Sequence, residues 1–358
     1  MQFEPFDLLA RVLEGHGRAR YDLSSSDMPA QRLSDYGGLE DRSLAENHPG
    51  GGEPLRAELA RLYGGHADEY IVTAGASEAD FAVCAALVGS GDRVLVERPT
   101  YQPLETIPRG LGATAIPLLR REEDEFQVTS EGVRATAPAD LRLLILTNLN
   151  NPTGVALEAS EVKRLADLAA ERGFYVFVDE TFRELAFDRD MPTIGGLNER
   201  TIVTSTVSKF YGAGGLRIGW IRSEGLARER IRSVLDYLSV TPAGPSEAIA
   251  LSLLKNREKT VARSRRLIEE GQKVAREWAA AEPDLVWHEP TAHLTFPGVG
   301  VDSARLAEIL LRDYDTFIAP AESFGLTEHF RLNVGIDAEN LHEGLARVSK
   351  ARATLKHR

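Results

Sequence analysis

Residues 143–154 read Leu-Leu-Ile-Leu-Thr-Asn-Leu-Asn-Asn-Pro-Thr-Gly, an apolar run that ends in an asparagine-rich loop. A strand buried on both faces of a parallel sheet carries such a continuous apolar run, whereas a strand with one solvated face alternates. In α/β sheets, ligands bind beyond the carboxyl ends of the strands. We therefore predict a parallel sheet with a binding site at the edge where this loop lies.

Strand-like and helix-like segments alternate on both sides of this run. The strand-like segments are rich in β-branched and aromatic residues and comprise Tyr70–Thr73, Arg93–Glu97, Leu143–Thr147, Phe174–Val178 and Thr201–Ser205. Helical patterns follow the first and the third of them, from Ser77, a candidate helix cap, to Val88 and from Glu158 to Arg172. This alternation predicts an α/β fold with a large doubly wound, mostly parallel sheet.

The pattern changes after Pro242 and Pro245. Residues 246–282 are rich in helix-forming residues, with Gly271 as the one weak point, and predict a single long connecting helix. Beyond this helix, two strand-like and two helix-like segments follow, namely Ala292–Phe296, Phe330–Val334, Leu306–Arg312 and Leu341–Lys350. We expect a large domain of residues 43–245 and a small α+β domain of residues 1–42 and 246–358.

Composition excludes several classes of function. The 42 Lys and Arg residues against 54 Asp and Glu residues leave a formal charge of -12, which argues against a nucleic-acid partner. The single cysteine, Cys84, lies in an apolar run, so we expect a small buried side chain, no intrachain disulfide and no metal site. No signal peptide and no apolar run of about 18 residues is visible, so we expect a cytoplasmic protein without a membrane partner.

Three strand-end loops carry polar residues suited to a ligand. Gly75-Ala76-Ser77 places backbone N–H groups at a helix start, which favours a phosphate, although a serine cap explains the segment equally well. The three asparagines of residues 148–151 indicate hydrogen bonds to a ligand. Asp179 ends an apolar strand, where a carboxylate either binds a cationic ligand group or caps a helix.

The segment Ser205–Trp220 holds hydroxyls, one lysine and one arginine in a glycine-rich frame. It is not a nucleotide-binding phosphate loop, because Lys209 precedes the glycines instead of following them. The pattern suits a lysine that acts as an amine nucleophile, with Arg217 eight residues later as a clamp for a phosphate.

In their order and spacing, Asn151–Gly154, Asp179-Glu180, Ser208-Lys209 and Arg217 resemble the pyridoxal-phosphate enzymes of fold type I, aminotransferase classes I and II. The resemblance extends from about Gly52 to Gly335. It implies that Lys209 holds pyridoxal 5'-phosphate as a Schiff base and moves the substrate proton, and that Asp179 pairs with the ring nitrogen. It also implies a set of cofactor-binding residues, namely Ala76, Ser77, Tyr101, Asn151, Asp179, Thr206, Ser208, Lys209 and Arg217.

The same resemblance implies that Arg331 binds the substrate α-carboxylate through a planar pair of donors. The alternative is a surface arginine on a strand of the small domain. The family further implies a homodimer, because its active sites lie at the subunit interface. The partners are then small-molecule substrates, namely an amino acid and a 2-oxo acid.

Two departures from the family pattern bear on substrate and chemistry. Phe182 stands where family members commonly have a tyrosine that bonds the ring oxygen, so we expect an altered pKa of the lysine–cofactor imine. The tyrosine that reaches the partner subunit's phosphate in many members is missing upstream of Gly52. Asn47 and His48 lie there, and neither is assigned that role; we expect His48 to be a solvated loop residue.

Smaller likenesses leave the reaction open. The ending Arg331–Gly335 is similar to the histidinol-phosphate aminotransferase branch, whereas Asp22–Ser26 and Phe182 are similar to capreomycidine-synthase-like members. The segment Asp22–Ser26 either reaches the substrate or forms a capped turn. The leading hypothesis is transamination between an L-amino acid and a 2-oxo acid. The alternatives are elimination, replacement, capreomycidine-synthase-like cyclisation or decarboxylation with the same cofactor, and a non-catalytic regulator that binds it.

Overall fold

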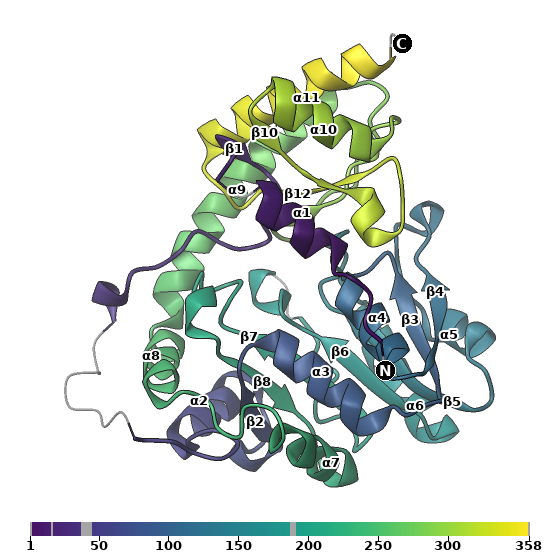
Figure 1. Cartoon of the computed structure of the whole chain (residues 1–358), viewed down its shortest axis with the longest axis vertical. Coiled ribbons are helices and arrows are strands. Elements are labelled where there is room, and N and C mark those ends of the chain that lie inside the picture. Colours follow the sequence, from purple (N-terminus) through teal and green to yellow (C-terminus); the bar gives the residue numbers. More distant parts are fainter. Residues whose placement is uncertain (1, 16, 37–44, 187–190, 357–358) are drawn as a thin grey trace.

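The computed structural model describes residues 2–15, 17–36, 45–186 and 191–356, so the domain boundary expected between residues 42 and 43 lies outside the described residues. At its centre is a seven-stranded sheet of order β2-β8-β7-β6-β5-β3-β4 (Figure 1). Only β8 runs against its neighbours, which confirms the mostly parallel sheet. The strands are β2 (Tyr70–Thr73), β3 (Arg93–Arg98), β4 (Thr114–Leu119), β5 (Leu141–Thr147), β6 (Tyr175–Asp179), β7 (Thr201–Thr206) and β8 (Gly219–Arg222).

Helices cover both faces of this sheet, which explains the continuous apolar run of β5. Leu143 and Ile145 pack in one cluster with residues of α3 (Ala76–Leu87), α4 (Gln102–Gly110) and α7 (Gly225–Leu235). Leu144 and Leu146 pack on the opposite face with residues of α5 (Ser130–Thr136) and α6 (Ala159–Arg172). Because side chains alternate between the faces of a strand, both faces need apolar residues. Cys84 of α3 is buried, as predicted.

The single long helix predicted for residues 246–282 is wrong. The segment forms α8 (Gly244–Lys255) and α9 (Arg257–Ala281), which are separated at Asn256. The Asn256 amide Nδ2 donates to the carbonyl oxygen of Ser252 at 2.8 Å, and its backbone N–H also bonds to that carbonyl at 3.1 Å. Such local side-chain bonds compete with helix continuation. Helix α8 packs beside α2 (Glu53–Tyr63), and α9 leads toward the C-terminal part of the chain (Figure 1).

A smaller antiparallel sheet of order β11-β12-β9 lies in that C-terminal part. Its strands are β9 (Leu294–Thr295), β11 (Ala319–Pro320) and β12 (Phe330–Asn333), so the strand predicted for Ala292–Phe296 is shorter than expected. The helices α10 (Ser303–Asp313) and α11 (Ala338–Lys356) extend beyond their predicted ranges. Within the described ranges, no helix combines the length and apolar character that crossing a membrane requires.

The N-terminal residues join this C-terminal part. Strand β1 (Tyr21–Asp22) pairs in parallel with β10 (Thr316–Phe317), and Leu8 of α1 (Asp7–Gly15) packs in a cluster with Phe296 and Phe324. Segments from both chain ends therefore lie side by side. Short 3₁₀ helices complete the described elements, namely Leu33–Asp35, Ala67–Glu69, Glu122–Asp124, Arg183–Leu185, Gly214–Leu216 and Ala321–Phe324.

Gly271 of α9 is a point of close contact rather than a weak point. It is buried, and a Cβ added there would overlap the carbonyl oxygen of Val334, directly after β12. The missing side chain lets α9 approach the backbone at the end of the small sheet.

We predict that Gly271→Ala destabilises the protein although alanine favours helices by about 1 kcal/mol over glycine. Overpacking a filled site typically costs about 1–3 kcal/mol, so after subtraction of the helix-propensity gain the free energy of unfolding in urea should fall by up to about 2 kcal/mol. Gly89→Ala is the control, because its added Cβ would meet only Asp92 Oδ2 at 3.7 Å. A Gly271→Ala protein as stable as the parent would contradict the close contact.

Candidate active site

Loops that follow five strands converge on one edge of the large sheet. Because β2, β3, β5, β6 and β7 all run in the same direction, their carboxyl ends lie together. The residues that these ends carry include Gly75, Tyr101, Asn151, Asp179 and Lys209. The site predicted from the strand-end loops therefore lies at a single edge of the sheet.

The start of α3 forms a cradle for an anion. The helix begins after Gly75, which has a φ of 87° and provides no side-chain cap, so the prediction that Ser77 caps this helix is wrong. A Cβ on Gly75 would overlap the Arg217 guanidinium, and Arg217 Nη2 donates to the carbonyl oxygen of Ala74 at 3.2 Å. Free N–H groups of a first helical turn beside a guanidinium suit a phosphate.

Two hydroxyl groups lie together at the end of β7. The Oγ atoms of Thr206 and Ser208 are 2.9 Å apart, and Thr206 Oγ1 donates to the carbonyl oxygen of Ile218 at 2.7 Å. The backbone N–H of Ser208 donates to Thr206 Oγ1 at 3.1 Å. Thr206 and Ser208 are both buried, so these hydroxyls are held in one arrangement directly before Lys209.

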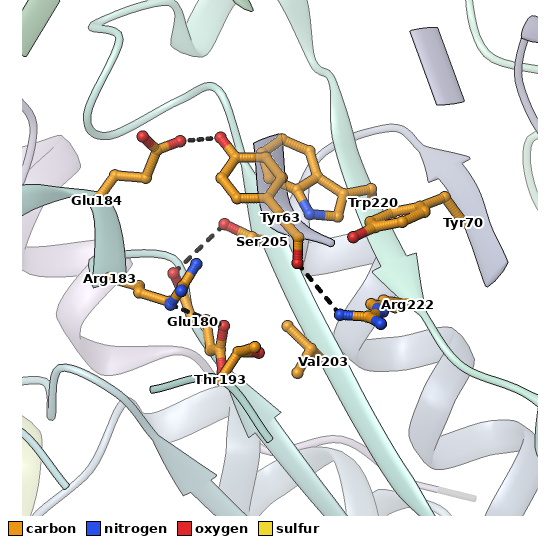
Figure 2. A pocket seen from close by; sticks show the side chains of 10 residues that line it. All are labelled: Tyr63, Tyr70, Glu180, Arg183, Glu184, Thr193, Val203, Ser205, Trp220 and Arg222. Atoms are coloured by element: carbon orange, nitrogen blue, oxygen red, sulfur yellow. Dashed lines mark hydrogen bonds and ion pairs between the residues drawn. The ribbon is translucent and has the colours of Figure 1, made fainter. Parts of the chain in front are cut away.

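A small cavity lies on the opposite face of the same strands. Ser205 and Glu180 line a cavity of about 20 Å³ with Tyr63, Glu184 and Trp220 (Figure 2). That volume accommodates about one water molecule. The Tyr63 ring stacks on Trp220 with centroids 5.3 Å apart, and Glu184 accepts hydrogen bonds from the hydroxyls of Tyr63 and Tyr211. This cavity is therefore too small for a cofactor.

Asp179 is a buried carboxyl group at the end of β6. Its Oδ1 accepts the N–H of Thr181 at 2.9 Å, while the following 3₁₀ helix is capped by Phe182, so the alternative role as a helix cap is wrong. Burial raises the pKa of Asp179, and burial together with the charge of Asp179 raises the pKa of Asp80, which accepts a hydrogen bond from Thr204 at 2.7 Å. A cationic N–H group beside Asp179 would stabilise its ionised form.

Lys209 contacts a residue that the sequence patterns did not indicate. Its Nζ forms an ion pair with the carboxylate of Asp27, and its carbonyl oxygen accepts the N–H of Met28 at 3.2 Å. The N-terminal segment therefore crosses the site at the lysine. Asp22 accepts hydrogen bonds from the N–H and the hydroxyl of Ser24, at 2.8 and 2.7 Å, so the capped turn predicted as one alternative for this segment is confirmed.

Arg331 is buried in β12, and the alternative of a surface arginine is wrong. It is 3% exposed, and its Nη1 donates to Asn151 Oδ1 at 3.0 Å and its Nη2 to the carbonyl oxygen of Ser24 at 2.7 Å. Its Nε has no partner among the described residues. Burial lowers the pKa of Arg331 to about 10, so the group stays cationic at neutral pH. An unpaired buried donor on a cation suits a carboxylate ligand.

Aromatic side chains border these polar groups. Tyr101 bonds to the Ser77 side chain and packs edge-on against Phe6, with ring centroids 5.4 Å apart, and burial raises its pKa. The Phe182 ring lies 5.0 Å from the ring of His293, which the sequence patterns also missed. Asn47 and His48 are partly or fully exposed and bond to their neighbours Ala45 and Glu46, which confirms His48 as a solvated loop residue.

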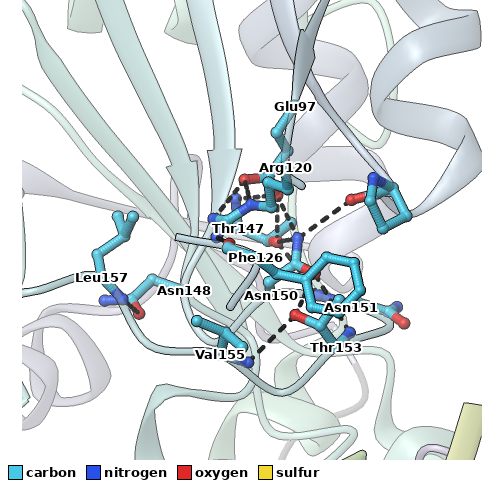
Figure 3. A network of polar contacts seen from close by, with 11 residues as sticks. Glu97, Arg120, Phe126, Thr147, Asn148, Asn150, Asn151, Thr153, Val155 and Leu157 are labelled. Carbon is cyan, nitrogen blue, oxygen red and sulfur yellow. Dashed lines mark hydrogen bonds and ion pairs between the residues drawn. The ribbon is translucent and has the colours of Figure 1, made fainter. Parts of the chain in front are cut away.

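A buried ion pair supports the loop that carries Asn151 (Figure 3). Arg120 donates through Nε and Nη2 to Glu97 Oε2, at 2.8 and 2.6 Å, and neither side chain is exposed. Glu97 Oε1 accepts the N–H of Thr147 at 2.7 Å and the amide of Asn150 at 2.9 Å. Asn150 therefore holds the loop through Glu97, whereas Asn151 faces Arg331. These two loop asparagines differ from each other in role.

Comparisons with known proteins agree with this geometry. The profile of the family described as aminotransferase class I and II matches residues 39–348. The chain is 23% identical to an aspartate aminotransferase of Streptomyces avermitilis (98% of this chain, 93% of the relative) and 27% identical to the capreomycidine synthase of Streptomyces vinaceus (98% and 95%). A crystal structure of a PLP-dependent aminotransferase from Streptococcus suis superposes with a TM-score of 0.93 at 24% identity over 99% of both chains, which shows the fold.

We predict that Arg120→Ala lowers the free energy of unfolding by about 3–5 kcal/mol, because it leaves Glu97 buried without its cation. Arg134→Ala is the matched control, since it breaks the Arg134–Glu171 pair, whose side chains are 53% and 57% exposed. Exposed pairs contribute little, so this control should unfold in urea almost as the parent does. Equal losses in the two variants would contradict the supporting role of the buried pair.

Proposed function

This chain belongs to the aminotransferase class I and II family, and we propose that it transfers the amino group of an L-amino acid to a 2-oxo acid with Lys209 as the cofactor-binding lysine. The enzyme is a pyridoxal-phosphate-dependent aminotransferase. When bound, pyridoxal phosphate supplies an electron-accepting ring that stabilises negative charge at the substrate α-carbon. The observation that carries the assignment of residues is the meeting of Lys209, Asp179, Arg217 and Arg331 at one edge of the sheet.

The phosphate would be held by the start of α3 and by β7. The backbone N–H groups of Ala76 and Ser77 and the hydroxyls of Thr206 and Ser208 are neutral donors, and Arg217 adds a positive charge. This donor set fits a phosphate, because it combines neutral donors with one cation. A Cβ on Gly75 would overlap the Arg217 guanidinium, so a glycine at this position leaves room for the arginine.

The ring would lie between Tyr101 and the carboxyl group of Asp179. Ionised Asp179 would hold a proton on the ring nitrogen, which compensates the burial that otherwise raises its pKa. Asn151 would donate to the ring oxygen through its amide nitrogen, since its Oδ1 already accepts from Arg331. Phe182 is apolar and adds no donor at its position.

Arg331 and Lys209 would act on the substrate itself. Arg331 is fixed by Asn151 and Ser24 and would orient the α-carboxylate with its remaining donor capacity. Lys209 would then accept the proton from the α-carbon at Nζ and would deliver it to the cofactor carbon. This proton movement would not involve the phosphate-holding groups, which are the hydroxyls of Thr206 and Ser208 and the cation Arg217.

The proposal includes the organisation of the chain. Residues 43–245 would form the large domain and residues 1–42 with 246–358 the small domain, which the pairing of β1 with β10 supports. The functional unit would be a homodimer, as the family implies. The exposed Asn47 and His48 are available for a partner subunit, although no described contact assigns either of them.

The direct test is to mix the cofactor-loaded enzyme with single amino acids and follow the visible absorbance of the cofactor. Conversion to the pyridoxamine form with release of a 2-oxo acid is the expected result. Release of ammonia, or of carbon dioxide, in place of this conversion would contradict transamination.

We predict that Lys209→Ala abolishes turnover, because the variant lacks the amine that binds the cofactor and moves the proton. Borohydride reduction followed by mass spectrometry should fix the cofactor on the peptide with Lys209 in the parent and on no peptide of the variant. Lys163→Ala is the control, since Lys163 is exposed and pairs only with Asp167. Turnover retained by Lys209→Ala would overturn the assignment of this lysine.

We also predict that Phe182→Tyr lowers the pKa read from the visible absorbance of the bound cofactor. A new hydroxyl donor would stabilise the anionic ring oxygen, so the neighbouring nitrogen would lose its proton more easily. Phe3→Tyr, at a side chain far more exposed than Phe182, is the control. An unchanged titration in Phe182→Tyr would refute the role of this position.

A further inference from the structure

Asp27 is a carboxylate of the site that none of these roles uses. Its backbone is fixed on both sides, since its N–H donates to Ser25 Oγ at 3.1 Å and its carbonyl oxygen accepts the amide of Asn333 at 3.2 Å. Its side chain is 47% exposed and contacts Lys209 Nζ. Asp27 is therefore an anchored anion at the reacting lysine and not a loose surface acid.

The cations around Asp27 are committed to other partners during the reaction. In the proposed function Lys209 is bound to the cofactor in the resting enzyme and must be a neutral amine when it accepts the α-proton, so it offers Asp27 no permanent ammonium group. Arg331 is also in electrostatic contact with Asp27, and it is assigned to the substrate α-carboxylate. While Lys209 is neutral and Arg331 holds the α-carboxylate, Asp27 is an anion that can pair with a cation of the substrate.

His293 offers a second acceptor beside this segment. It is completely buried, and its Nε2 lies 3.2 Å from the carbonyl oxygen of Ser26, which makes Nε2 the donor of the ring. Its Nδ1 is then an acceptor, and this atom has no partner among the described residues. Burial, with the charges of Arg331 and Lys209, lowers the pKa of His293 to about 3, so the ring is neutral.

We propose that Asp27 binds the cationic side chain of the amino donor, with His293, which contacts the neighbouring Ser26, as a further acceptor. The substrate class is then an L-amino acid that carries a guanidinium or ammonium group, and dicarboxylic amino acids are repelled. A carboxylate and a ring nitrogen that accepts match a group that only donates hydrogen bonds. This inference rests on the proposed function, because it presumes that an amino acid binds at Arg331 and Lys209.

The test compares amino acids of equal shape that differ in charge. Arginine is paired with citrulline and lysine with norleucine, and glutamate serves as the acidic donor. Rates of cofactor conversion are measured without a 2-oxo acid, and binding to the loaded enzyme is measured by calorimetry. The parent should prefer arginine over citrulline, or lysine over norleucine, by about tenfold or more, as removal of a charge-assisted hydrogen bond implies.

Asp27→Asn is the informative variant, because it keeps the shape of the side chain and removes its charge. The preference for the cationic member of each pair should collapse to within about threefold, since a neutral amide gains little from a cation. Asp35→Asn is the matched control, since Asp35 belongs to the same N-terminal segment, is exposed and, among the described residues, accepts the N–H of Arg32 in its own turn. This control should retain the preference of the parent.

Different results separate this inference from the proposed function. If no amino acid converts the cofactor, transamination fails, while the calorimetric ratios still decide on Asp27. A parent enzyme that converts glutamate best, or that treats arginine and citrulline alike, overturns the inference and leaves transamination intact. An unchanged preference in Asp27→Asn overturns the role of Asp27.

Discussion

The carboxylate of Glu97 joins the carboxyl ends of β3, β4 and β5, and the site is built on this junction. Glu97 belongs to β3, Arg120 directly follows β4, and Thr147 ends β5. A buried ion pair is tolerated only where its remaining lone pairs are also satisfied. Both oxygens of Glu97 have such partners, so the loop that follows Thr147 is held in one position. The direction of Asn151 therefore follows from a contact in the core of the sheet.

From Asn151 the connection continues into a different part of the chain. Arg331 bridges Asn151 and the carbonyl oxygen of Ser24, and the N-terminal segment then passes Lys209, where Met28 and Asp27 contact it. Segments that lie far apart in the sequence thus close around one point. Because each of them is fixed by backbone hydrogen bonds, the charged groups are already oriented before a ligand arrives, which reduces the cost of ordering them.

Local sequence patterns made most of the strands and several polar residues of the candidate site predictable. Continuous apolar runs mark strands that are covered on both faces, and Lys209, Asp179 and Arg217 stand in loops where such residue types serve a ligand better than a fold. Asn256 was missed because the helix propensity of a long segment hides one residue that bonds to its own preceding turn. Ser77 was misread because a serine at a helix start is a cap in most sequences, whereas here Gly75 has that position.

The sequence by itself determined the mostly parallel sheet, because the periodicity of apolar residues is a local property, and its strand-end loops indicated the edge at which we expect a ligand. The roles of the lysine, the aspartate and the arginines toward pyridoxal phosphate followed from the resemblance to the aminotransferase family. Tertiary structure alone decided that Arg331 is buried, that Asp27 contacts Lys209 across 182 positions, and that His293 presents an unpaired nitrogen. A lone aspartate or histidine carries no local pattern. Such a residue acquires a role only when folding removes water from it and places another polar or charged group within a few ångströms.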